Sequence, residues 1–347
     1  MFAQVLNGDG RRLPLADEIV QCVITSPPYW GLRDYGVDGQ LGSEATPAEF
    51  VENLVAVFRE VGRVLRDDGT VWLNLGDSYA GGGRGGNSEV ITGKGKDASI
   101  IVRSKRVERG NGSGRWGGGD VAVPDLPAKN LVGIPWRVAL ALQADGWYLR
   151  QDIIWHKPNP MPESVKDRCT KAHEYVFLLS KSERYYFDGE AIAEDGVSKV
   201  KDKNKVPSGW DTNKRAHGTV HQEGRSAPEY SFKRRVNEEP PPGQPAQHRE
   251  DREDVEYSDK RNKRSVWTVS TRGYKGAHFA TFPPKLVEPM VLAGSAPGDV
   301  VLDPFAGTAT VGQVCIQHGR SFVGVELKRE YIGLARRRLA QVQMVLI

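Results

Sequence analysis

Apolar residues in the first quarter of the chain follow first the spacing of a strand and then that of a helix. Residues 19–24 form a short apolar run rich in β-branched side chains, which predicts a buried strand ending at Thr25-Ser26-Pro27-Pro28-Tyr29-Trp30. Residues 50–65 carry apolar side chains at helical intervals, and the Asp-Asp-Gly of 67–69 is predicted to close that helix. A second apolar run at 70–75 predicts the next strand, so this region predicts a β-α-β unit.

The rest of the chain repeats this alternation, with turn-forming residues between the segments. Three prolines within 157–162 exclude a helix or a strand there. Residues 299–310 pass from an apolar strand through a turn of small residues into the start of a helix. The other predicted helices are 134–142, 285–294 and 329–339, and the other predicted strands are 150–156, 175–180 and 321–326.

Two segments lack hydrophobic periodicity and concentrate positive charge. The net charge of the chain is +4, yet residues 80–116 hold eight Lys/Arg against three Asp/Glu, and 197–275 hold eighteen against twelve. We expect a mobile, Gly-rich basic loop at 80–120 and either a linker or an inserted recognition module at 195–262. Each could be no more than a solvated charged loop, but their shared sign favours a polyanion-binding surface.

Composition excludes several classes of protein. Apolar residues make up 39% of the chain, which is enough for a full core, and the longest apolar runs are strand-sized, so no membrane-spanning helix is expected. No targeting segment is expected at the start of the chain. Cys22, Cys169 and Cys315 lie far apart, which excludes a disulfide framework, predicts no metal site and suits a reducing cytoplasm.

The predicted strand and turn at 299–310 have the features of a nucleotide-cofactor site. The strand ends in Asp303-Pro304-Phe305-Ala306-Gly307-Thr308, whose small residues let backbone N–H groups approach a ligand. Glu326 ends the next predicted strand, about twenty residues on, where a carboxylate can grip both hydroxyls of a ribose. A carboxylate at the strand tip would repel a pyrophosphate but attract an ammonium group. The expected cofactor is therefore S-adenosyl-L-methionine, with a generic strand-to-helix turn as the alternative.

The motif Ser26-Pro27-Pro28-Tyr29 suits methyl transfer to an amino nitrogen of a nucleic acid base. Such a transfer needs the nitrogen lone pair aimed at the methyl donor, and two acceptors for the N–H bonds would aim it. The Ser26 hydroxyl and the Pro27 carbonyl can supply them, and Tyr29 offers a ring on which a flipped base can stack. In that role Phe or Trp should replace Tyr29 with much of the activity kept. A simple change of chain direction at two prolines is the alternative.

Five segments together resemble the β group of the amino-DNA methyltransferases, in which the catalytic motif precedes the cofactor motif. Residues 25–30 resemble motif IV of that family, and 303–308 resemble motif I. Three more resemble its motif VIII, its motif X and a short acidic motif beside the cofactor adenine, namely 154–162, 278–285 and Asn7-Gly8-Asp9. The resemblance implies an α/β fold with a doubly wound, mostly parallel seven-stranded sheet, helices on both faces and an inserted target-recognition region.

The resemblance also implies the site residues and the division into domains. The catalytic residues would be Ser26, Pro27, Pro28 and Tyr29. The cofactor-binding residues would be Asp9, Phe279, Ala280, Thr281, Phe282, Asp303, Pro304, Phe305, Gly307, Thr308 and Glu326. Residues 1–194 would form the catalytic half of the core, 195–262 the target-recognition insertion and 263–347 the cofactor-binding half. Ala309 stands where the family usually has a second glycine, and its methyl group is expected to crowd the cofactor.

The expected function is site-specific methylation of cytosine N4 in duplex DNA, by base flipping and direct transfer from S-adenosyl-L-methionine. Ser26 favours cytosine, because Asp or Asn is commoner at this position in the adenine-N6 enzymes; adenine N6 is the alternative. A methyltransferase acting on RNA or protein, or an inactive DNA-binding regulator, would explain less of the sequence. Double-stranded DNA is the expected partner. A homodimer and a separately acting cognate restriction endonuclease are further candidates.

Overall fold

The computed structural model describes residues 2–31, 36, 37, 39–81, 123, 126–195, 260–271 and 283–345, with side chains as far as 342. The chain divides into two units. Met1–Ile192 and Arg264–Ile347 form the first, and Ala193–Lys263 forms the second. In the second unit the described residues form two antiparallel strands, β6 (Glu194–Asp195) and β7 (Lys260–Arg261), with Glu194 near the cationic groups of Arg261 and Lys263.

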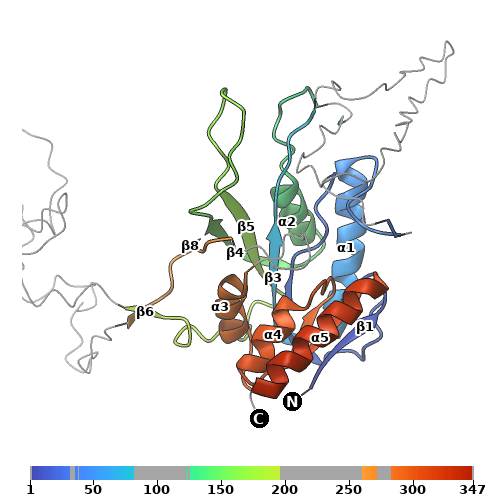
Figure 1. The fold of residues 1–347 in the computed structure, drawn as a ribbon, viewed down its shortest axis with the longest axis vertical. Coiled ribbons are helices and arrows are strands. Elements are labelled where there is room, and N and C mark those ends of the chain that lie inside the picture. Colours follow the sequence, from blue (N-terminus) through green and yellow to red (C-terminus); the bar gives the residue numbers. More distant parts are fainter. Residues whose placement is uncertain are drawn as a thin grey trace, which may run out of the picture. The chain divides into compact units, whose positions relative to one another are not determined.

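An eight-stranded sheet runs through the first unit in the order β1-β10-β9-β2-β3-β5-β4-β8 (Figure 1). All neighbouring strands are parallel except the two pairs that include β5, which confirms a mostly parallel sheet. The strands are β1 (Ala3–Asn7), β2 (Val20–Thr25), β3 (Leu65–Leu75), β4 (Tyr148–His156), β5 (His173–Ser180), β8 (Val266–Thr268), β9 (Val300–Asp303) and β10 (Ser321–Glu326).

Within the described ranges the sheet has eight strands, which corrects the expected seven. The added strand is the edge strand β8, whose three residues pair in parallel with the end of β4. Burial explains it, because the Trp267 side chain is 5% exposed and its ring centroid lies 6.1 Å from that of Trp72. The opposite edge strand, β1, was not predicted either, because a strand of five residues in which only Val5 is buried gives a weak pattern.

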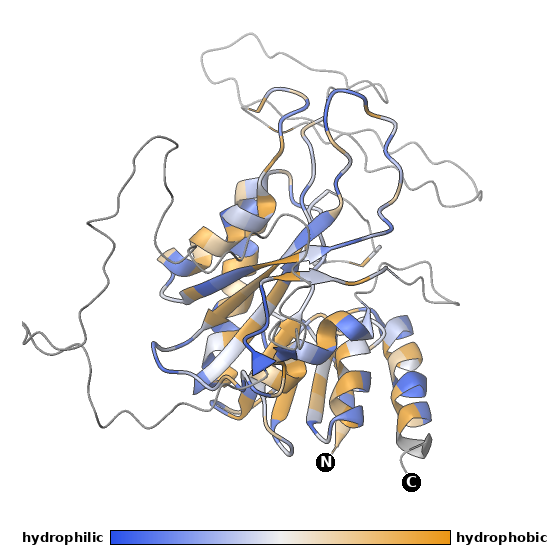
Figure 2. Cartoon of the chain, turned by 90° about the vertical axis from the view of Figure 1, so that its left-hand side faces the viewer, coloured by the Kyte–Doolittle hydropathy of each residue, from blue (hydrophilic) through white to orange (hydrophobic). Residues whose placement is uncertain are grey.

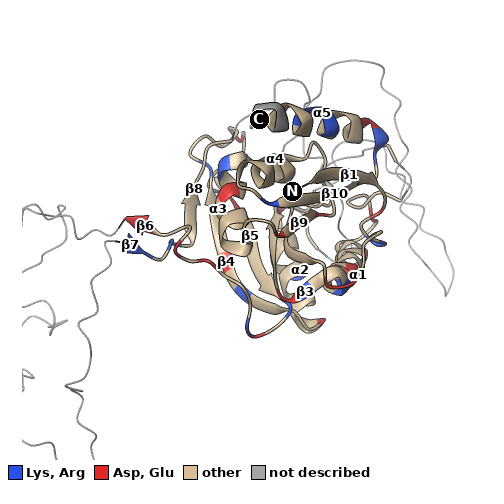
Figure 3. Ribbon diagram, turned by 90° about the horizontal axis from the view of Figure 1, so that it is seen from below, with Lys and Arg blue, Asp and Glu red and all other residues tan. Residues whose placement is uncertain are grey.

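In the described residues, five helices cover the two faces of the sheet. They are α1 (Pro47–Val64), α2 (Ile134–Ala144), α3 (Pro284–Gly294), α4 (Thr310–Gln317) and α5 (Arg329–Val345). One core cluster joins α1 and α2 to one face, and the other joins α3, α4 and α5 to the opposite face, as Figure 3 shows. Apolar colouring in Figure 2 accordingly gathers in the strands and along the helices. In the described part of the chain, every helix is too short or too polar to cross a membrane.

Helix α1 covers the predicted apolar run at 50–65 except its last residue, and it begins at Pro47 after an N-cap at Thr46. The Thr46 hydroxyl accepts a hydrogen bond from the Glu49 N–H (3.2 Å), and the Glu49 carboxylate accepts one from the Ala45 N–H (3.1 Å). The helix stops at Val64 because the next residue, Leu65, is fully buried and already extended. Residues 67–69 therefore do not close the helix; they lie in an irregular stretch of β3, where the register against β2 shifts.

The remaining predicted elements are found within a few residues of their expected bounds. Helices α2 and α3 and strands β2, β4, β5 and β10 match the predicted segments, and 157–162 form neither a helix nor a strand. Helix α5 continues past the predicted end at 339 to Val345. The basic segments predicted at 80–120 and 195–262 lie outside the described residues except at their ends.

Candidate active site

The carboxyl ends of four neighbouring parallel strands, β1, β10, β9 and β2, meet at one edge of the sheet. The crossover through α1 from β2 to β3 and the crossover through α4 from β9 to β10 lie on opposite faces, so the strand order reverses between β2 and β9. Ligands of open α/β sheets bind at such a reversal. The four strands end in Asn7, Glu326, Asp303 and Thr25.

A cavity at this edge is lined by predicted residues from three separate motifs. Ser26 and Pro28 come from the loop after β2, Asp9 from the loop after β1, and residues 303–308 with Glu326 from the ends of β9 and β10. Segments that are far apart in the sequence are thus brought to one place, as the parallel topology predicts. Sequence reasoning missed several further lining residues that have no motif of their own, among them Gln40, Leu41, Lys328 and Tyr331.

Asp303 is the most buried carboxylate of the cavity, with a side chain that is 2% exposed. Its Oδ1 accepts a hydrogen bond from the Thr25 hydroxyl (2.7 Å) and another from the Phe305 N–H (3.1 Å). Burial raises its pKa to about 7, and the negative charge of Glu326 adds to this, while the two hydrogen bonds act in the opposite direction. Such a carboxylate gains from a cationic ligand.

Glu326 occupies the neighbouring strand end, with both carboxylate oxygens held by backbone donors. The Gly307 N–H donates to Oε2 (2.9 Å) and the Lys328 N–H donates to Oε1 (2.8 Å). Burial raises the pKa of Glu326, and the hydrogen bonds from these backbone groups partly offset the rise. The side chain is therefore fixed at the cavity wall, with further acceptor capacity on its two oxygens.

The turn between β9 and α4 needs two residues with left-handed backbone. Gly307 has φ +50, and Ala309 has φ 57 and ψ 47. Ala309 is fully buried, belongs to the core cluster beneath α3, α4 and α5, and does not line the cavity. Its methyl group therefore does not line the cavity, in contrast to the expected crowding; the cost of the alanine lies in its backbone conformation.

Asp9 lines the cavity beyond Glu326 and is held by Arg11. The guanidinium of Arg11 contacts both carboxylate oxygens, with the shortest contact at 2.5 Å, and also donates to the Gly39 carbonyl (2.9 Å). Burial opposes ionisation of Asp9, but its hydrogen bonds with Arg11 and the charge of Arg11 outweigh it and lower the pKa. Arg11 was not predicted from the sequence.

A chain of polar side chains extends from the catalytic motif across β3 to β5. Ser26 Oγ donates to Tyr29 Oη (3.4 Å), and Tyr29 Oη lies 2.8 Å from Glu174 Oε2 and 3.1 Å from Asn74 Oδ1. The Lys157 ammonium pairs with the other oxygen of Glu174. Asn74, Lys157 and Glu174 were not predicted, because single polar residues at strand ends give no local pattern.

The ring of Tyr29 lies against Gly76 at the end of β3. A Cβ atom at that position would come within 2.5 Å of the ring, so only glycine allows the approach. Pro27 is buried, whereas Ser26, Pro28 and Tyr29 are partly exposed. The predicted cofactor residues Phe279, Ala280, Thr281 and Phe282 lie outside the described residues.

Comparison with known proteins identifies the family. Residues 20–337 match the family model N6_N4_Mtase, described as DNA methylase. Type II methyltransferase M.Cfr9I of Citrobacter freundii is 42% identical over 341 residues, which span 97% of this chain and 87% of the relative. Type II methyltransferase M.SmaI of Serratia marcescens is 41% identical over 338 residues, which span 97% of this chain and 90% of the relative.

Solved structures share the fold. The PvuII DNA methyltransferase, named cytosine-N4-specific, superposes with a TM-score of 0.57 at 17% identity, covering 99% of this chain and 91% of that one. A putative DNA modification methylase from Thermus thermophilus, complexed with S-adenosyl-L-methionine, gives 0.53 at 21% identity, covering 98% and 94%. The chain belongs to the DNA methylase family. It is a DNA methyltransferase of the cytosine-N4 or adenine-N6 kind, and its methyl donor is S-adenosyl-L-methionine, as the sequence predicted.

Proposed function

We propose that this enzyme methylates the N4 amino group of cytosine in duplex DNA, by flipping the base out and transferring the methyl group directly. The observation that carries the proposal is the position of Ser26, which lines the same cavity as Asp303 and Glu326. The preceding residue, Thr25, donates to Asp303 across the strand reversal (2.7 Å). The loop assigned to the base and the carboxylates assigned to the cofactor are thus held against each other.

The residues of the cavity fit the proposed cofactor. S-adenosyl-L-methionine supplies an electrophilic methyl group on a sulfonium centre. Asp303 would bind the ammonium of its methionine part, because a buried carboxylate with a raised pKa gains from a cation. Glu326, fixed by two backbone N–H groups, would accept hydrogen bonds from the ribose hydroxyls. Asp9 would lie near the adenine, and the Phe305 ring lines the same cavity. Residues 279–282 are proposed to contact the methionine part.

The catalytic motif would orient the amino group rather than attack the base. The Ser26 hydroxyl and the Pro27 carbonyl would accept the two N–H bonds, so that the nitrogen lone pair faces the methyl group. Tyr29, packed on Gly76, would stack against the flipped base. Covalent attack by a thiol is not part of this mechanism: Cys22 lies fully buried in β2, and burial raises its pKa to about 12.

Cytosine is favoured over adenine by the hydroxyl at the first position of the motif. Asp or Asn is commoner there in adenine-N6 enzymes, and the structural neighbour from PvuII is itself named cytosine-N4-specific. We further propose that the division into 1–194, 195–262 and 263–347 is functional. In this division 195–262 reads the target sequence, with help from the basic residues of 80–120.

The test is the identity of the methylated nucleoside. DNA incubated with the enzyme and S-adenosyl-L-methionine would be digested to nucleosides and analysed by mass spectrometry. N4-methylcytosine is expected, and N6-methyladenine would instead establish the alternative. Ser26→Ala should slow single-turnover transfer and leave cofactor affinity, measured by calorimetry, nearly intact, because the lost hydrogen bond acts in the transition state. An unaltered rate, or a covalent protein–DNA adduct, would contradict the mechanism.

A further inference from the structure

The hydrogen bonds around Tyr29 have one consistent direction. Tyr29 has a single hydroxyl proton and two nearby acceptors, Glu174 Oε2 at 2.8 Å and Asn74 Oδ1 at 3.1 Å; Glu174 is both the closer and the charged acceptor, so it takes the proton. An ionised carboxylate only accepts hydrogen bonds, so this contact commits the Tyr29 proton to Glu174. The lone pairs of Tyr29 Oη are then left to accept the proton of Ser26, whose Oγ lies 3.4 Å away. The Ser26 hydroxyl oxygen can then accept a hydrogen bond from a group bound in the cavity that this residue lines.

The carboxylate at the end of this chain is held in place from several sides. Lys157 pairs with Oε1 of Glu174, and the Asn74 side-chain amide donates to Oε2 (3.3 Å) and to the Tyr175 carbonyl (3.0 Å). The Lys157 ammonium also lies 4.3 Å from the centroid of the Trp155 ring. Both members of the ion pair are mostly buried, with side chains 18% and 16% exposed, so water weakens the interaction less than at an open surface.

We propose that Glu174 is a positioning residue for methyl transfer, acting through Tyr29 to make Ser26 a hydrogen-bond acceptor. The inference rests on the proposed role of Ser26. A serine hydroxyl can donate or accept, and only an accepting hydroxyl can orient an amino group by its N–H bond. The ionised Glu174 fixes the Tyr29 proton, and Tyr29 fixes the Ser26 proton. The 3.4 Å contact between Ser26 and Tyr29 is the weakest step, as expected of a catalytic contact before substrate binds.

This role differs from pure stacking in what it predicts for the Tyr29 hydroxyl. If Tyr29 only stacks on the base, Tyr29→Phe keeps much of the wild-type activity, as the sequence alone predicted, and its single-turnover rate should be close to that of the wild type. If the hydroxyl relays the orientation, Tyr29→Phe and Glu174→Gln each lower the single-turnover rate by about tenfold, the effect of about one hydrogen bond. Because both changes interrupt the same chain, the double variant should lose little more than either single one.

The experiment measures methyl transfer from labelled S-adenosyl-L-methionine into unmethylated plasmid DNA that the wild type modifies, with enzyme in excess. The four proteins are wild type, Tyr29→Phe, Glu174→Gln and the double variant. Thermal denaturation and cofactor calorimetry verify that each variant folds and binds the methyl donor. Glu163→Gln is the matched control, because Glu163 also pairs with a partly buried cation, Arg168, but has no place in the hydrogen-bonded chain from Ser26 to Glu174. The rate of this control variant should be that of the wild type.

Two results would overturn the inference. One is a wild-type rate for Tyr29→Phe, and the other is a multiplicative loss near a hundredfold in the double variant, which would mean that Glu174 acts independently of Tyr29. The test is separate from that of the proposed function, because the transfer rate is measured whichever base accepts the methyl group. If the product is N6-methyladenine and the rate losses of the two single variants are not additive, cytosine is not the target base, but Glu174 still acts through Tyr29.

Discussion

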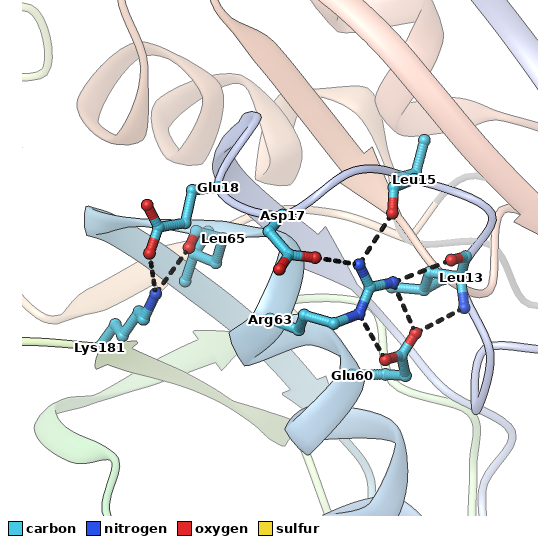
Figure 4. A network of polar contacts seen from close by, with 8 residues as sticks. All are labelled: Leu13, Leu15, Asp17, Glu18, Glu60, Arg63, Leu65 and Lys181. Atoms are coloured by element: carbon cyan, nitrogen blue, oxygen red, sulfur yellow. Dashed lines mark hydrogen bonds and ion pairs between the residues drawn. The ribbon is translucent and has the colours of Figure 1, made fainter.

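Two polar networks in the first unit hold their charged groups in opposite ways. At the end of α1, Arg63 has a partner for each guanidinium nitrogen: Glu60, Asp17 and the carbonyls of Leu13 and Leu15 (Figure 4). Lys181 is held similarly, near the Glu18 carboxylate (3.5 Å) and donating to the Leu65 carbonyl (3.1 Å). Cations and carboxylates compensate one another there, and the network ties the loop before β2 to α1.

Two carboxylates of the cavity, those of Asp303 and Glu326, are held differently, whereas Asp9 in the same cavity pairs with Arg11. Asp303 accepts from a hydroxyl and a backbone N–H, and Glu326 accepts from backbone N–H groups. The pKa values of both are raised by burial, whereas that of Glu60 is lowered, chiefly by its hydrogen bond with Arg63. Buried charge that the protein leaves largely uncompensated indicates a place for a ligand. Compensated charge indicates structure.

The largest effect that would test this comparison is on cofactor affinity. Glu326→Ala removes a charge-assisted acceptor from the proposed ribose site, so binding of S-adenosyl-L-methionine should weaken by about 1.5–3 kcal/mol. Isothermal calorimetry on the folded variant measures it. The free energy of unfolding should change less, because Glu326 binds only backbone donors that water can replace. Unchanged affinity would remove Glu326 from the cofactor site.

A substitution in the network at the end of α1 should lower stability and leave cofactor affinity unchanged. Arg63→Ala leaves Glu60, Asp17 and two carbonyls without their shared donor, which should lower the free energy of unfolding by about 1 kcal/mol, a modest value because the side chain is 34% exposed. Cofactor affinity should be that of the wild type. If Arg63→Ala instead weakened cofactor binding and left the free energy of unfolding unchanged, the network around Arg63 would not be a purely structural one.

An effect of similar size on cofactor affinity depends on pH and follows from Asp303. The pKa of Asp303, about 7, lies above the ordinary value of 3.8, so its ionised form lowers the free energy of unfolding of the cofactor-free protein. This loss is complete above pH 7 and disappears as pH falls toward 4. A cationic ligand favours the ionised form. Affinity should therefore rise with pH up to about 7 and be about tenfold weaker near pH 6 than the limit reached above the pKa.

Calorimetry between about pH 5.5 and 7 measures this dependence below the range in which an α-amino group titrates. Binding there should release protons, seen as a difference in heat between buffers of unlike ionisation enthalpy. Asp303→Asn cannot release them, so its affinity should be weaker and nearly independent of pH. A wild-type affinity that is flat over this interval would contradict the assignment of Asp303 to the ammonium group.

How much of this could be predicted from the sequence depends on whether a feature is local. Asp303 and Glu326 follow apolar runs directly, and parallel strands bring such ends together, so the sequence predicted that the two lie close to each other, and both line the cavity. Glu174, Asn74 and Lys157 come together only through the register of β3, β5 and β4, which one sequence does not reveal. Strands β1 and β8 were missed because each is short and lies at an edge of the sheet.

Ala309 shows the same limit at a single residue. The sequence places it in the cofactor turn, but only the structure shows the direction of its Cβ atom. The residue is fully buried on the side of the α3–α4–α5 cluster, and its N–H donates to the Ala306 carbonyl (2.7 Å). A methyl group in that position meets the core rather than the cavity. The departure from the family pattern therefore lies in the core beside the cavity rather than in the lining of the cavity.

The smallest expected effect is that of Ala309→Gly, and it sharpens the comparison because the residue lies in the cofactor turn but should act only on structure. Glycine relieves a left-handed backbone that costs alanine about 1–2 kcal/mol. It also loses about 0.8 kcal/mol of methyl burial and about 0.4–1 kcal/mol through the greater freedom of the unfolded chain. These terms nearly cancel, so the free energy of unfolding should change by less than about 1 kcal/mol. Denaturant titration measures that change, and calorimetry should give the wild-type cofactor affinity. A clearly tighter affinity in the glycine variant would mean that the methyl group does crowd the cofactor, and that the turn rearranges when the cofactor binds.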